Sequence, residues 1–472
     1  MKRIFSAVIF AAVFLSLMLA SCSNKYGLDS SKPVTVYVWH YYNGALMKAF
    51  DALVKEFNEE VGVNEGIIVE SLSFGSLSEL ENAVISSAKK EAGSAQMPDI
   101  FATYADTALK VEELNLLANL DEYFSDEEQA QYHDSFISEG RIGKNGELRI
   151  IPVAKTPEIL LINETDWLPF ADANNLTYGD LETAEGLSRV SELYYNWSGG
   201  KAFFGRDVIA NMFIIASKQF GVEILGQENG KAKIEINRDI MKKIWDFYYV
   251  PYISGWFYSY GKFRSDDTRA GDILAYVGAT SSAAYFPAEV AVSGSSYPIN
   301  FKALPAPLLS GGSKVIVQQG AGMAVTKSDE QREYASVVFL KWFTDVKNNI
   351  GFSALSGYMP VKKEVASYAA FSENLEQNGI SINPIANEAL KVVFDEAADS
   401  EFYTVKAFPG SAEARVVLEN NLRGKADSDR AEVISLIEGG LAEKDAVALF
   451  SSEEKFNEWL EEFTKELNEA VE

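Results

Sequence analysis

The alternation of strand and helix patterns near the start of the chain constrains its fold more than any other feature. Residues 34–39, VTVYVW, are β-branched or aromatic, as is typical of a strand. In residues 46–60 the apolar side chains recur at helical spacing, and residues 67–104 continue with strand, helix and strand patterns. Such alternation predicts a parallel sheet with helices on its faces, so we expect an α/β protein.

Length and charge narrow the possibilities further. The chain has 472 residues, of which 47% are hydrophobic, so it is globular but too long for a single hydrophobic core. We therefore expect two domains. The formal net charge of −26 argues against nucleic acid or an anionic lipid surface as a partner. It says little about a small ligand, because a cleft can carry its own local field.

The only cysteine, Cys22, follows an apolar stretch of 17 residues that begins after Met1-Lys2-Arg3. This order is typical of a secretory signal, and Leu19-Ala20-Ser21-Cys22 resembles a bacterial lipobox. In such signals cleavage precedes the cysteine, and its thiol receives a diacylglycerol. We expect residues 1–21 to be a lipoprotein signal peptide and residues 22–32 a lipidated tether. The alternative is an ordinary signal peptide with an incidental cysteine.

Motifs for catalysis are missing from the sequence. It contains two histidines, His40 and His133, and no cysteine besides Cys22, which leaves no zinc cluster and no cysteine nucleophile. Neither a Gly-x-Ser-x-Gly segment nor a glycine-rich phosphate loop occurs. We expect no metal, no cofactor and no enzymatic activity. Because the chain has 68 carboxylates, a surface glycosidase with an acid/base pair stays open as the alternative from another class. A surface adhesin or sensor is a third.

Four segments, in order, resemble family 1 extracellular solute-binding proteins, the ligand receptors of ABC importers for sugars and glycerol 3-phosphate. They are residues 34–60, 97–124, 151–163 and 319–363. The resemblance implies a bilobal periplasmic-binding-protein-like fold of type II, in which two α/β lobes joined by crossing hinge segments close on the ligand. It places one lobe at 34–155 plus 315–350, the other at 156–314 plus 351–425, and a C-terminal helical segment at 426–472.

The resemblance also implies a set of ligand-binding residues. The tyrosine of a Thr-Gly-Tyr-x-Pro segment in glycerol 3-phosphate receptors corresponds to Tyr358 in SGYMP, and an arginine of a late helix corresponds to Arg415. Asp106 is a substitute for a displaced acidic residue, and this displacement favours a carbohydrate over a phosphate ester. The remaining positions implied by the resemblance are a glycine, serines and residues beside the hinge: Gly320, Ser281 or Ser282, and Lys155 or Thr156.

The chemistry of these residue types leaves alternatives. The guanidinium of Arg415 suits phosphate or paired hydroxyls, but by spacing it could instead pair with Glu413 or Glu419 on a helix surface. Tyr358 could stack on a sugar or sit in a core. Trp256, in the aromatic run YISGWFYSYGKF, could form a stacking platform or fill a core. His40 follows the first strand, where open α/β sheets bind ligands.

The resulting hypothesis is a monomeric, lipid-anchored, extracytoplasmic receptor of an ABC importer. We expect it to capture a carbohydrate by closure of the two lobes and to deliver it to the permease subunits. A receptor for glycerol 3-phosphate or another polyol phosphate is the alternative within the same family. The lysine beside the hinge, Lys155, and Arg415 favour the phosphate ester, whereas Trp256 and its aromatic neighbours favour the sugar.

Overall fold

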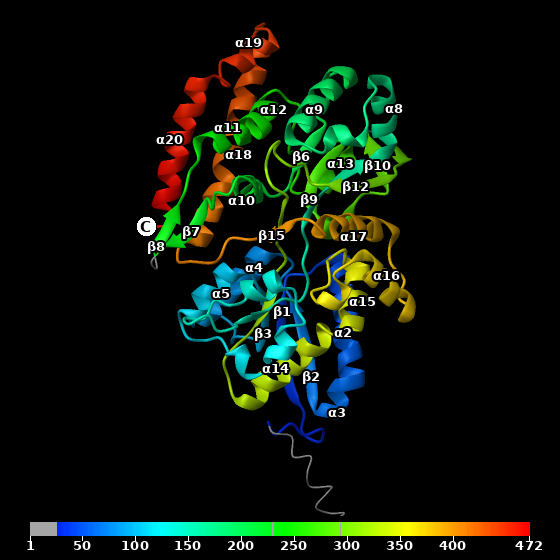
Figure 1. Ribbon diagram of the computed structural model, residues 1–472, viewed down its shortest axis with the longest axis vertical. Coiled ribbons are helices and arrows are strands. Elements are labelled where there is room, and N and C mark those ends of the chain that lie inside the picture. Colours follow the sequence, from blue (N-terminus) through cyan, green and yellow to red (C-terminus); the bar gives the residue numbers. More distant parts are fainter. Residues whose placement is uncertain (1–25, 229–230, 293) are drawn as a thin grey trace, which may run out of the picture.

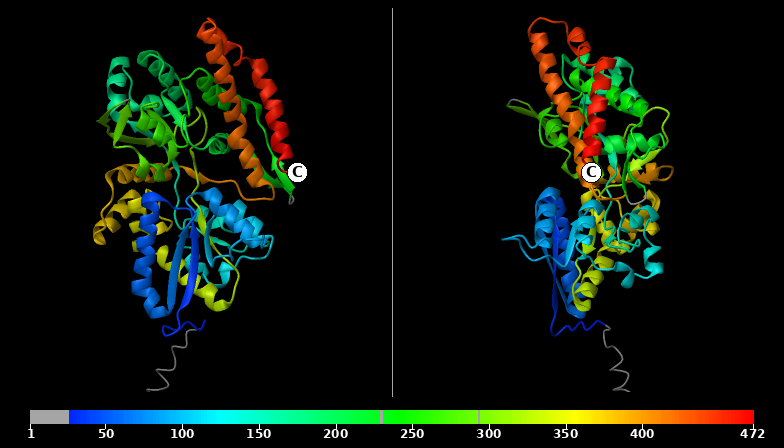
Figure 2. Two further views of the ribbon diagram at one scale, coloured as in Figure 1. Left: turned by 180° about the vertical axis from the view of Figure 1, so that it is seen from behind. Right: turned by 90° about the vertical axis from the view of Figure 1, so that its left-hand side faces the viewer.

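Two lobes are stacked along the long axis of the computed structural model, which describes residues 26–228, 231–292 and 294–472 (Figure 1). We call the lobe that contains the N-terminal strands lobe 1 and the other lobe 2. The C-terminal helices pack on the outer flank of lobe 2, as both further views show (Figure 2). The expected bilobal α/β fold is confirmed.

Lobe 1 is built around a five-stranded sheet of order β2-β1-β3-β14-β4. The first three strands are parallel, as the alternation predicts, and Val36 lies opposite Val69. The sheet is mixed, however, because β14 returns from much later in the chain and pairs antiparallel with both β3 and β4. The strands are β1 (Val34–His40), β2 (Ile67–Ser73), β3 (Ile100–Thr103), β4 (Ile150–Ile151) and β14 (Gly322–Val325).

Helices cover the sheet of lobe 1 because their apolar faces are buried. Helix α2 buries Leu46, Phe50 and Phe57 and packs against β2 and α15. The helices of this part are α2 (Gly44–Phe57), α3 (Val63–Glu65), α4 (Leu77–Ala88), α5 (Ala105–Glu112), α6 (Asp126–Gln129), α7 (Asp134–Glu139), α14 (Glu330–Phe343), α15 (Val346–Ser356) and α16 (Tyr368–Gln377). The domain boundary expected at residue 350 falls inside α15.

Lobe 2 has a four-stranded sheet of order β12-β5-β9-β6. Its central strand β5 is buried at every position and pairs antiparallel with both neighbours, so this sheet also departs from the parallel expectation. The strands are β5 (Glu158–Asn163), β6 (Phe204–Arg206), β9 (Ala275–Ala279) and β12 (Phe301–Pro305), with two hairpins, β7 (Leu225–Glu228) with β8 (Lys231–Ile234) and β10 (Glu289–Val292) with β11 (Ser295–Pro298).

The helices of lobe 2 include a long C-terminal pair. Aromatic contacts fasten this pair to the lobe: the rings of Phe213 and Phe463 are stacked at 5.2 Å, and those of Trp245 and Trp459 lie 5.3 Å apart. The helices are α8 (Glu164–Asn174), α9 (Ala184–Ser198), α10 (Ile209–Gln219), α11 (Arg238–Ile244), α12 (Val250–Ile253), α13 (Arg264–Ala270), α17 (Pro384–Ala397), α18 (Ser411–Glu438), α19 (Glu443–Ala448) and α20 (Glu453–Glu469).

Several chain segments cross between the lobes and run side by side. The backbone of Lys155 exchanges hydrogen bonds with that of Met359, and the N–H of Thr156 donates to the carbonyl of Gln319 at 2.9 Å. Strand β13 (Val315–Val317), just before the crossing at Gln319, pairs in parallel with β15 (Glu401–Tyr403). The crossing at Lys155-Thr156-Pro157 thus lies where the sequence places a hinge, and proline holds the preceding residue extended.

Candidate functional site

A cavity of about 740 Å³ lies between the two lobes. Helices α4 and α5 of lobe 1 form one wall, and helices α10 and α18 of lobe 2 form the other; these helices face each other across the middle of the molecule (Figure 1). Most of the remainder is lined by residues next to the crossing segments: Val317, Gln318, Gln319, Thr404, Val405 and Ala407. This volume is within the range of small-molecule binding sites.

The wall of lobe 2 is a network of hydrogen-bonded polar side chains centred on Asn211. The guanidinium of Arg415 donates to Asn211 Oδ1 at 2.5 Å. Asn211 Nδ2 in turn donates to Glu158 Oε1 at 2.8 Å and to Gln319 Oε1 at 2.9 Å. Glu158 also forms a buried ion pair with Arg206. Because each of these groups is held by the next, Arg415 is oriented before any ligand arrives.

The wall of lobe 1 carries charges with fewer fixed partners. Thr107 Oγ1 donates to Glu81 Oε1 at 3.0 Å, and the N–H of Thr107 donates to Asp106 Oδ1 at 2.8 Å. Burial, and then the neighbouring Asp106 carboxylate, raise the pKa of Glu81 to about 7. Lys110 reaches across to lobe 2 and pairs with Glu413 at 2.8 Å. This wall therefore presents ionisable groups near the ligand space.

The backbone explains how Asp106 reaches the cavity. Strand β3 ends at Thr103, and α5 begins at Ala105, so the first turn of α5 lies at the carboxyl end of a parallel strand. Asp106 occupies that first turn, where a carboxylate interacts favourably with the helix dipole. Of the residues implied by the resemblance, Asp106 and Arg415 both line the cavity, from opposite lobes.

Five other predicted residues are brought together at the crossing, behind the cavity. Thr156 Oγ1 lies 3.1 Å from Ser281 Oγ and accepts from the Ser281 N–H at 3.0 Å. Lys155 Nζ donates to Gly320 O at 3.0 Å and pairs with Glu139 at 2.5 Å. Burial raises the pKa of Tyr358, and its side-chain hydrogen bonds with Tyr41 and Ser281 oppose this shift.

Gly320 requires its glycine at this crossing. Its φ is +107°, and a Cβ there would lie 2.6 Å from the carbonyl oxygen of Ala154. The N–H of Gly320 donates to the hydroxyl of Tyr104 at 3.3 Å, and Tyr104 lines the cavity. The crossing cluster therefore contacts the cavity through Tyr104 and Glu139, whereas Lys155, Thr156, Gly320, Ser281 and Tyr358 themselves are not among the described lining residues.

Three further predicted residues lie away from the cavity. His40 is 1% exposed in the core of lobe 1, with its ring 4.8 Å from that of Phe50, and burial lowers its pKa to about 4. Trp256 is half-buried against the core of lobe 2, where its carbonyl accepts from the N–H of Phe203 at 2.8 Å. Ser282 is half-buried in the turn after β9. Cys22 lies outside the described residues.

Sequence reasoning missed several lining residues. The signal for Asn211 was a single amide within the apolar helix sequence IANMFIIAS, where a fully buried polar group needs partners. Glu81 and Lys110 carried no such signal, because charged residues on amphipathic helices are ordinarily solvated. Among the described lining residues, Tyr104 is the one aromatic side chain.

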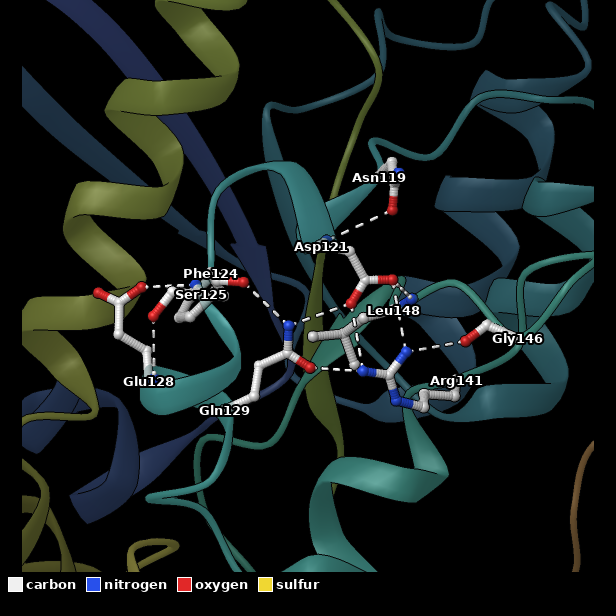
Figure 3. Close-up of polar contacts among 9 residues, drawn as sticks. All are labelled: Asn119, Asp121, Phe124, Ser125, Glu128, Gln129, Arg141, Gly146 and Leu148. Atoms are coloured by element: carbon white, nitrogen blue, oxygen red, sulfur yellow. Dashed lines mark hydrogen bonds and ion pairs between the residues drawn. The ribbon is translucent and has the colours of Figure 1, made fainter.

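A second polar cluster lies in lobe 1 outside the cavity (Figure 3). Asp121 accepts from the N–H of Leu148 at 3.0 Å and from Gln129 Nε2 at 3.1 Å, and it pairs with Arg141 at 3.2 Å. Although burial opposes it, these hydrogen bonds lower the pKa of Asp121. Arg141 also donates to Gly146 O at 2.9 Å, so the cluster fastens the irregular chain between residues 119 and 148.

The described part of the chain offers no clustered metal ligands, and none of its helices has the length and apolar character needed to span a bilayer. No curated protein sequence matches the chain.

Three solved structures illustrate the fold. The cyclic α-maltosyl-1,6-maltose binding protein of Arthrobacter globiformis has a TM-score of 0.63 at 20% identity, covering 91% of this chain and 100% of its own. UgpB of Mycobacterium tuberculosis, in complex with glycerophosphocholine, has a TM-score of 0.65 at 18% identity, covering 93% and 100%. The maltotriose binding protein of Thermus thermophilus has a TM-score of 0.59 at 14% identity, covering 93% and 100%.

The model of one family matches residues 52–378, more than half of the chain, and it describes a bacterial extracellular solute-binding protein. This match agrees with the two lobes and with the cavity between them. The chain therefore belongs to the bacterial extracellular solute-binding proteins, which are binding components that act outside the cytoplasm rather than enzymes.

Proposed function

We propose that this protein is the lipid-anchored receptor of an ABC importer and that it captures a carbohydrate between its two lobes. The observation that carries the proposal is the cavity of about 740 Å³, lined by polar groups from both lobes. Carboxylates, amides and hydroxyls can accept and donate the many hydrogen bonds that a sugar offers. Binding to both walls would shift the equilibrium between open and closed forms.

The charges of the cavity support a neutral ligand. The carboxylates of Glu81, Asp106, Glu139 and Glu419 line it, together with the cations Lys89, Lys110 and Arg415. Glu139 and Lys110 are already paired with Lys155 and Glu413. The remaining carboxyl groups, of Glu81, Asp106 and Glu419, offset the remaining cations, Lys89 and Arg415. The cavity therefore has no excess of positive charge for a phosphate ester, and its carboxyl groups can form hydrogen bonds with sugar hydroxyls. The cavity also suits an oligosaccharide better than a three-carbon phosphate.

A polyol phosphate is the second candidate, and the guanidinium of Arg415 is the observation that favours it. A guanidinium binds phosphate through two parallel hydrogen bonds. Lys89 and Lys110 line the same cavity and could add charge. The similarity to the glycerophosphocholine complex of UgpB is consistent with this alternative, as the similarity to the maltose-type receptors is with the first.

Thermal unfolding against a ligand panel tests the proposal and separates the two candidates. The chain from residue 24 onward would be unfolded with mono- and oligosaccharides, polyols, glycerol 3-phosphate and glycerophosphodiesters. A ligand at 100 times its Kd stabilises by about 2.7 kcal/mol, which raises the melting temperature measurably. We expect the rise with one oligosaccharide series. A rise with phosphate esters alone would replace the carbohydrate by the second candidate, and turnover of an oligosaccharide would contradict a receptor.

Lipid attachment is tested separately in cells. We expect radiolabelled palmitate to be incorporated into the wild-type chain and not into Cys22→Ser, which would be released from the membrane fraction. Delivery to a permease predicts that purified receptor stimulates uptake of its ligand into vesicles that contain the importer. Release of the wild-type chain in the same form as Cys22→Ser would contradict the anchor without affecting the ligand proposal.

A further inference from the structure

The segment that follows the expected lipidation site is fastened to lobe 1. The ring of Tyr26 stacks on that of Tyr334, with centroids 4.0 Å apart and 22° between the planes, and it lies 5.8 Å from the ring of Tyr123. Leu28 is 9% exposed. The side-chain amide of Gln331 donates to the carbonyl of Gly27 at 2.5 Å. Helix α14 thus holds this segment at two consecutive residues.

The rest of the segment is held as well. The carboxylate of Asp29 accepts from the N–H and the hydroxyl of Ser31, at 2.8 and 2.7 Å. The backbone of Asp29 passes so close to Gly66, just after α3, that a Cβ at Gly66 would lie 2.4 Å from Asp29 O. Strand β1 then begins at Val34. Tyr26 and Leu28, in the stretch expected from the sequence to be a polar tether, therefore pack on the folded body, whereas residues 29–32 are exposed and pass close to Gly66 before β1.

This fastened segment lies at one end of the molecule. It emerges at the tip of lobe 1 that faces away from lobe 2, beside α3, and the two further views agree (Figures 1 and 2). Three residues separate Cys22 from Tyr26 in the sequence. Four residue steps of chain span at most about 14 Å, because an extended residue covers about 3.5 Å.

We propose that the bilayer surface contacts the tip of lobe 1, so that lobe 1 lies next to the membrane and lobe 2 lies far from it. The inference rests on the proposed lipid at Cys22, and it adds an orientation that anchoring alone does not give. A lipid attached within about 14 Å of Tyr26 keeps the tip of lobe 1 at the headgroups. A long free tether would leave the orientation open.

The far end of lobe 2 is well removed from that tip. Helix α18 starts at the cavity, where Arg415 lines the wall, and continues to Glu438. At 1.5 Å per residue this part of α18 is about 35 Å long. It points away from lobe 1 (Figure 1).

Energy transfer to a labelled bilayer tests this orientation. Every contact described above lies within residues 26–472, so the chain that begins at Cys22 keeps the whole described fold. Because Cys22 is the only cysteine, a maleimide lipid couples at that position alone, whether or not cells lipidate it. A donor fluorophore would be placed through an azide-bearing amino acid in place of Glu65, beside the tip of lobe 1, or in place of Glu438, at the far end of α18; both side chains are exposed. The vesicles would carry an acceptor lipid.

We expect strong transfer from position 65 and background transfer from position 438. Two variants should abolish this difference in energy transfer between the two positions. In the first, Tyr26→Ala combined with Leu28→Ser frees the segment from lobe 1. In the second, a long Gly/Ser stretch is inserted between residues 25 and 26. Tyr37→Ala, an exposed tyrosine on β1, is the matched control and should keep the difference. All variants should unfold at temperatures near that of the parent chain, because Tyr26 and Leu28 lie at the edge of the core.

Equal transfer from the two positions in the parent chain would overturn the orientation, as would a difference that survives both the freed segment and the insertion. Since the lipid is attached chemically, this result is independent of lipidation in cells. A lack of palmitate incorporation would contradict the lipid anchor in the proposed function. Equal energy transfer from the two positions would contradict only the proposed orientation on lobe 1.

Discussion

The two walls of the cavity are built in different ways. In lobe 2, Arg415 is held by Asn211, which is 0% exposed and is itself fixed by Glu158 and Gln319. In lobe 1, Glu81 and Asp106 accept mainly from the neighbouring Thr107, and Lys110 is held only by a carboxylate of the opposite lobe. Lobe 2 thus offers a preorganised surface, whereas lobe 1 offers charges with fewer fixed partners, which are free to rearrange in the proposed closure of the lobes.

This difference suggests an order of events. A ligand that first binds the wall of lobe 2 finds its hydrogen-bond partners already oriented, and it therefore loses less entropy on binding. Closure then brings the charged wall of lobe 1 into contact. The comparison predicts that substitutions in the lobe 2 network affect both folding and binding, and that substitutions in the lobe 1 wall change pH dependence or closure with smaller effects.

Asn211→Ala should have the largest effect. It leaves Glu158, Gln319 and Arg415 each without one partner, and an unsatisfied buried polar group costs about 1–3 kcal/mol. We expect a loss of about 3 kcal/mol in the free energy of unfolding, measured by urea denaturation, together with a loss of ligand affinity. Asn420→Ala, an exposed amide that also lines the cavity, is the control and should change stability little. Equal effects of the two variants would contradict a preorganised wall.

Arg415→Ala should weaken ligand binding more than it weakens the fold. Loss of a charged hydrogen-bond donor costs about 1.5–3 kcal/mol, and we expect this in the Kd measured by calorimetry. The free energy of unfolding should fall by about 1 kcal/mol, because Asn211 Oδ1 loses its donor, and this loss is smaller than that in Asn211→Ala, which leaves three groups without a partner. Arg423→Ala, on the same helix but outside the cavity lining, should bind normally. Unchanged affinity in Arg415→Ala would contradict the site.

The sequence predicts the local elements of this fold better than their pairing. Strands β1 and β3 are apolar runs between amphipathic helices, so their presence and parallel order follow from hydrophobic periodicity. The antiparallel return of β14 beside β3 does not, because it pairs residues about 220 positions apart, such as Gly322 with Thr103. No local pattern encodes such a partner, which is decided by the packing of the whole lobe.

The candidate site was predictable only in part, for a related reason. Of the ligand-binding residues that the resemblance implies, Asp106 and Arg415 line the cavity. Lys155, Thr156 and Tyr358 are instead buried at the crossing, because the hinge needs satisfied polar groups where several chains meet. The residue types alone could not separate these two uses of polar side chains.

Glu81→Gln should remove a pH dependence of stability. The pKa of Glu81 is raised to about 7 by burial and then by Asp106, above the ordinary value of 4.5. Between these values the folded chain binds more protons at this site than the unfolded chain does, so its contribution to stability falls as pH rises. We expect this fall to be about 1–2 kcal/mol, after allowance for partial exposure to solvent.

Urea denaturation at a series of pH values from 4 to 8 measures this effect. The profile of Glu81→Gln should fall less over this range than that of the parent chain. Glu79→Gln, exposed on the same helix, is the matched control and should reproduce the parent profile. If Glu81→Gln also reproduces the parent profile, burial and the neighbouring Asp106 do not raise the pKa of Glu81 in the folded chain.

The smallest effect should come from the ion pair that joins the two walls. Lys110 and Glu413 lie 2.8 Å apart with exposed fractions of 42% and 52%, and an exposed pair of this kind contributes about 0.2–1 kcal/mol. The pair connects α5 to α18 across the cavity, so its energy stabilises the closed arrangement rather than either lobe.

We expect Lys110→Glu to weaken ligand affinity up to about fivefold at low salt. The charge exchange, Lys110→Glu together with Glu413→Lys, should restore the affinity. Small-angle scattering would show the single variant shifted toward an open form, and high salt should abolish the difference because it screens exposed charges. If the exchange does not restore affinity, each residue acts on the ligand separately, and the charged wall of lobe 1 contacts the ligand directly instead of acting through closure.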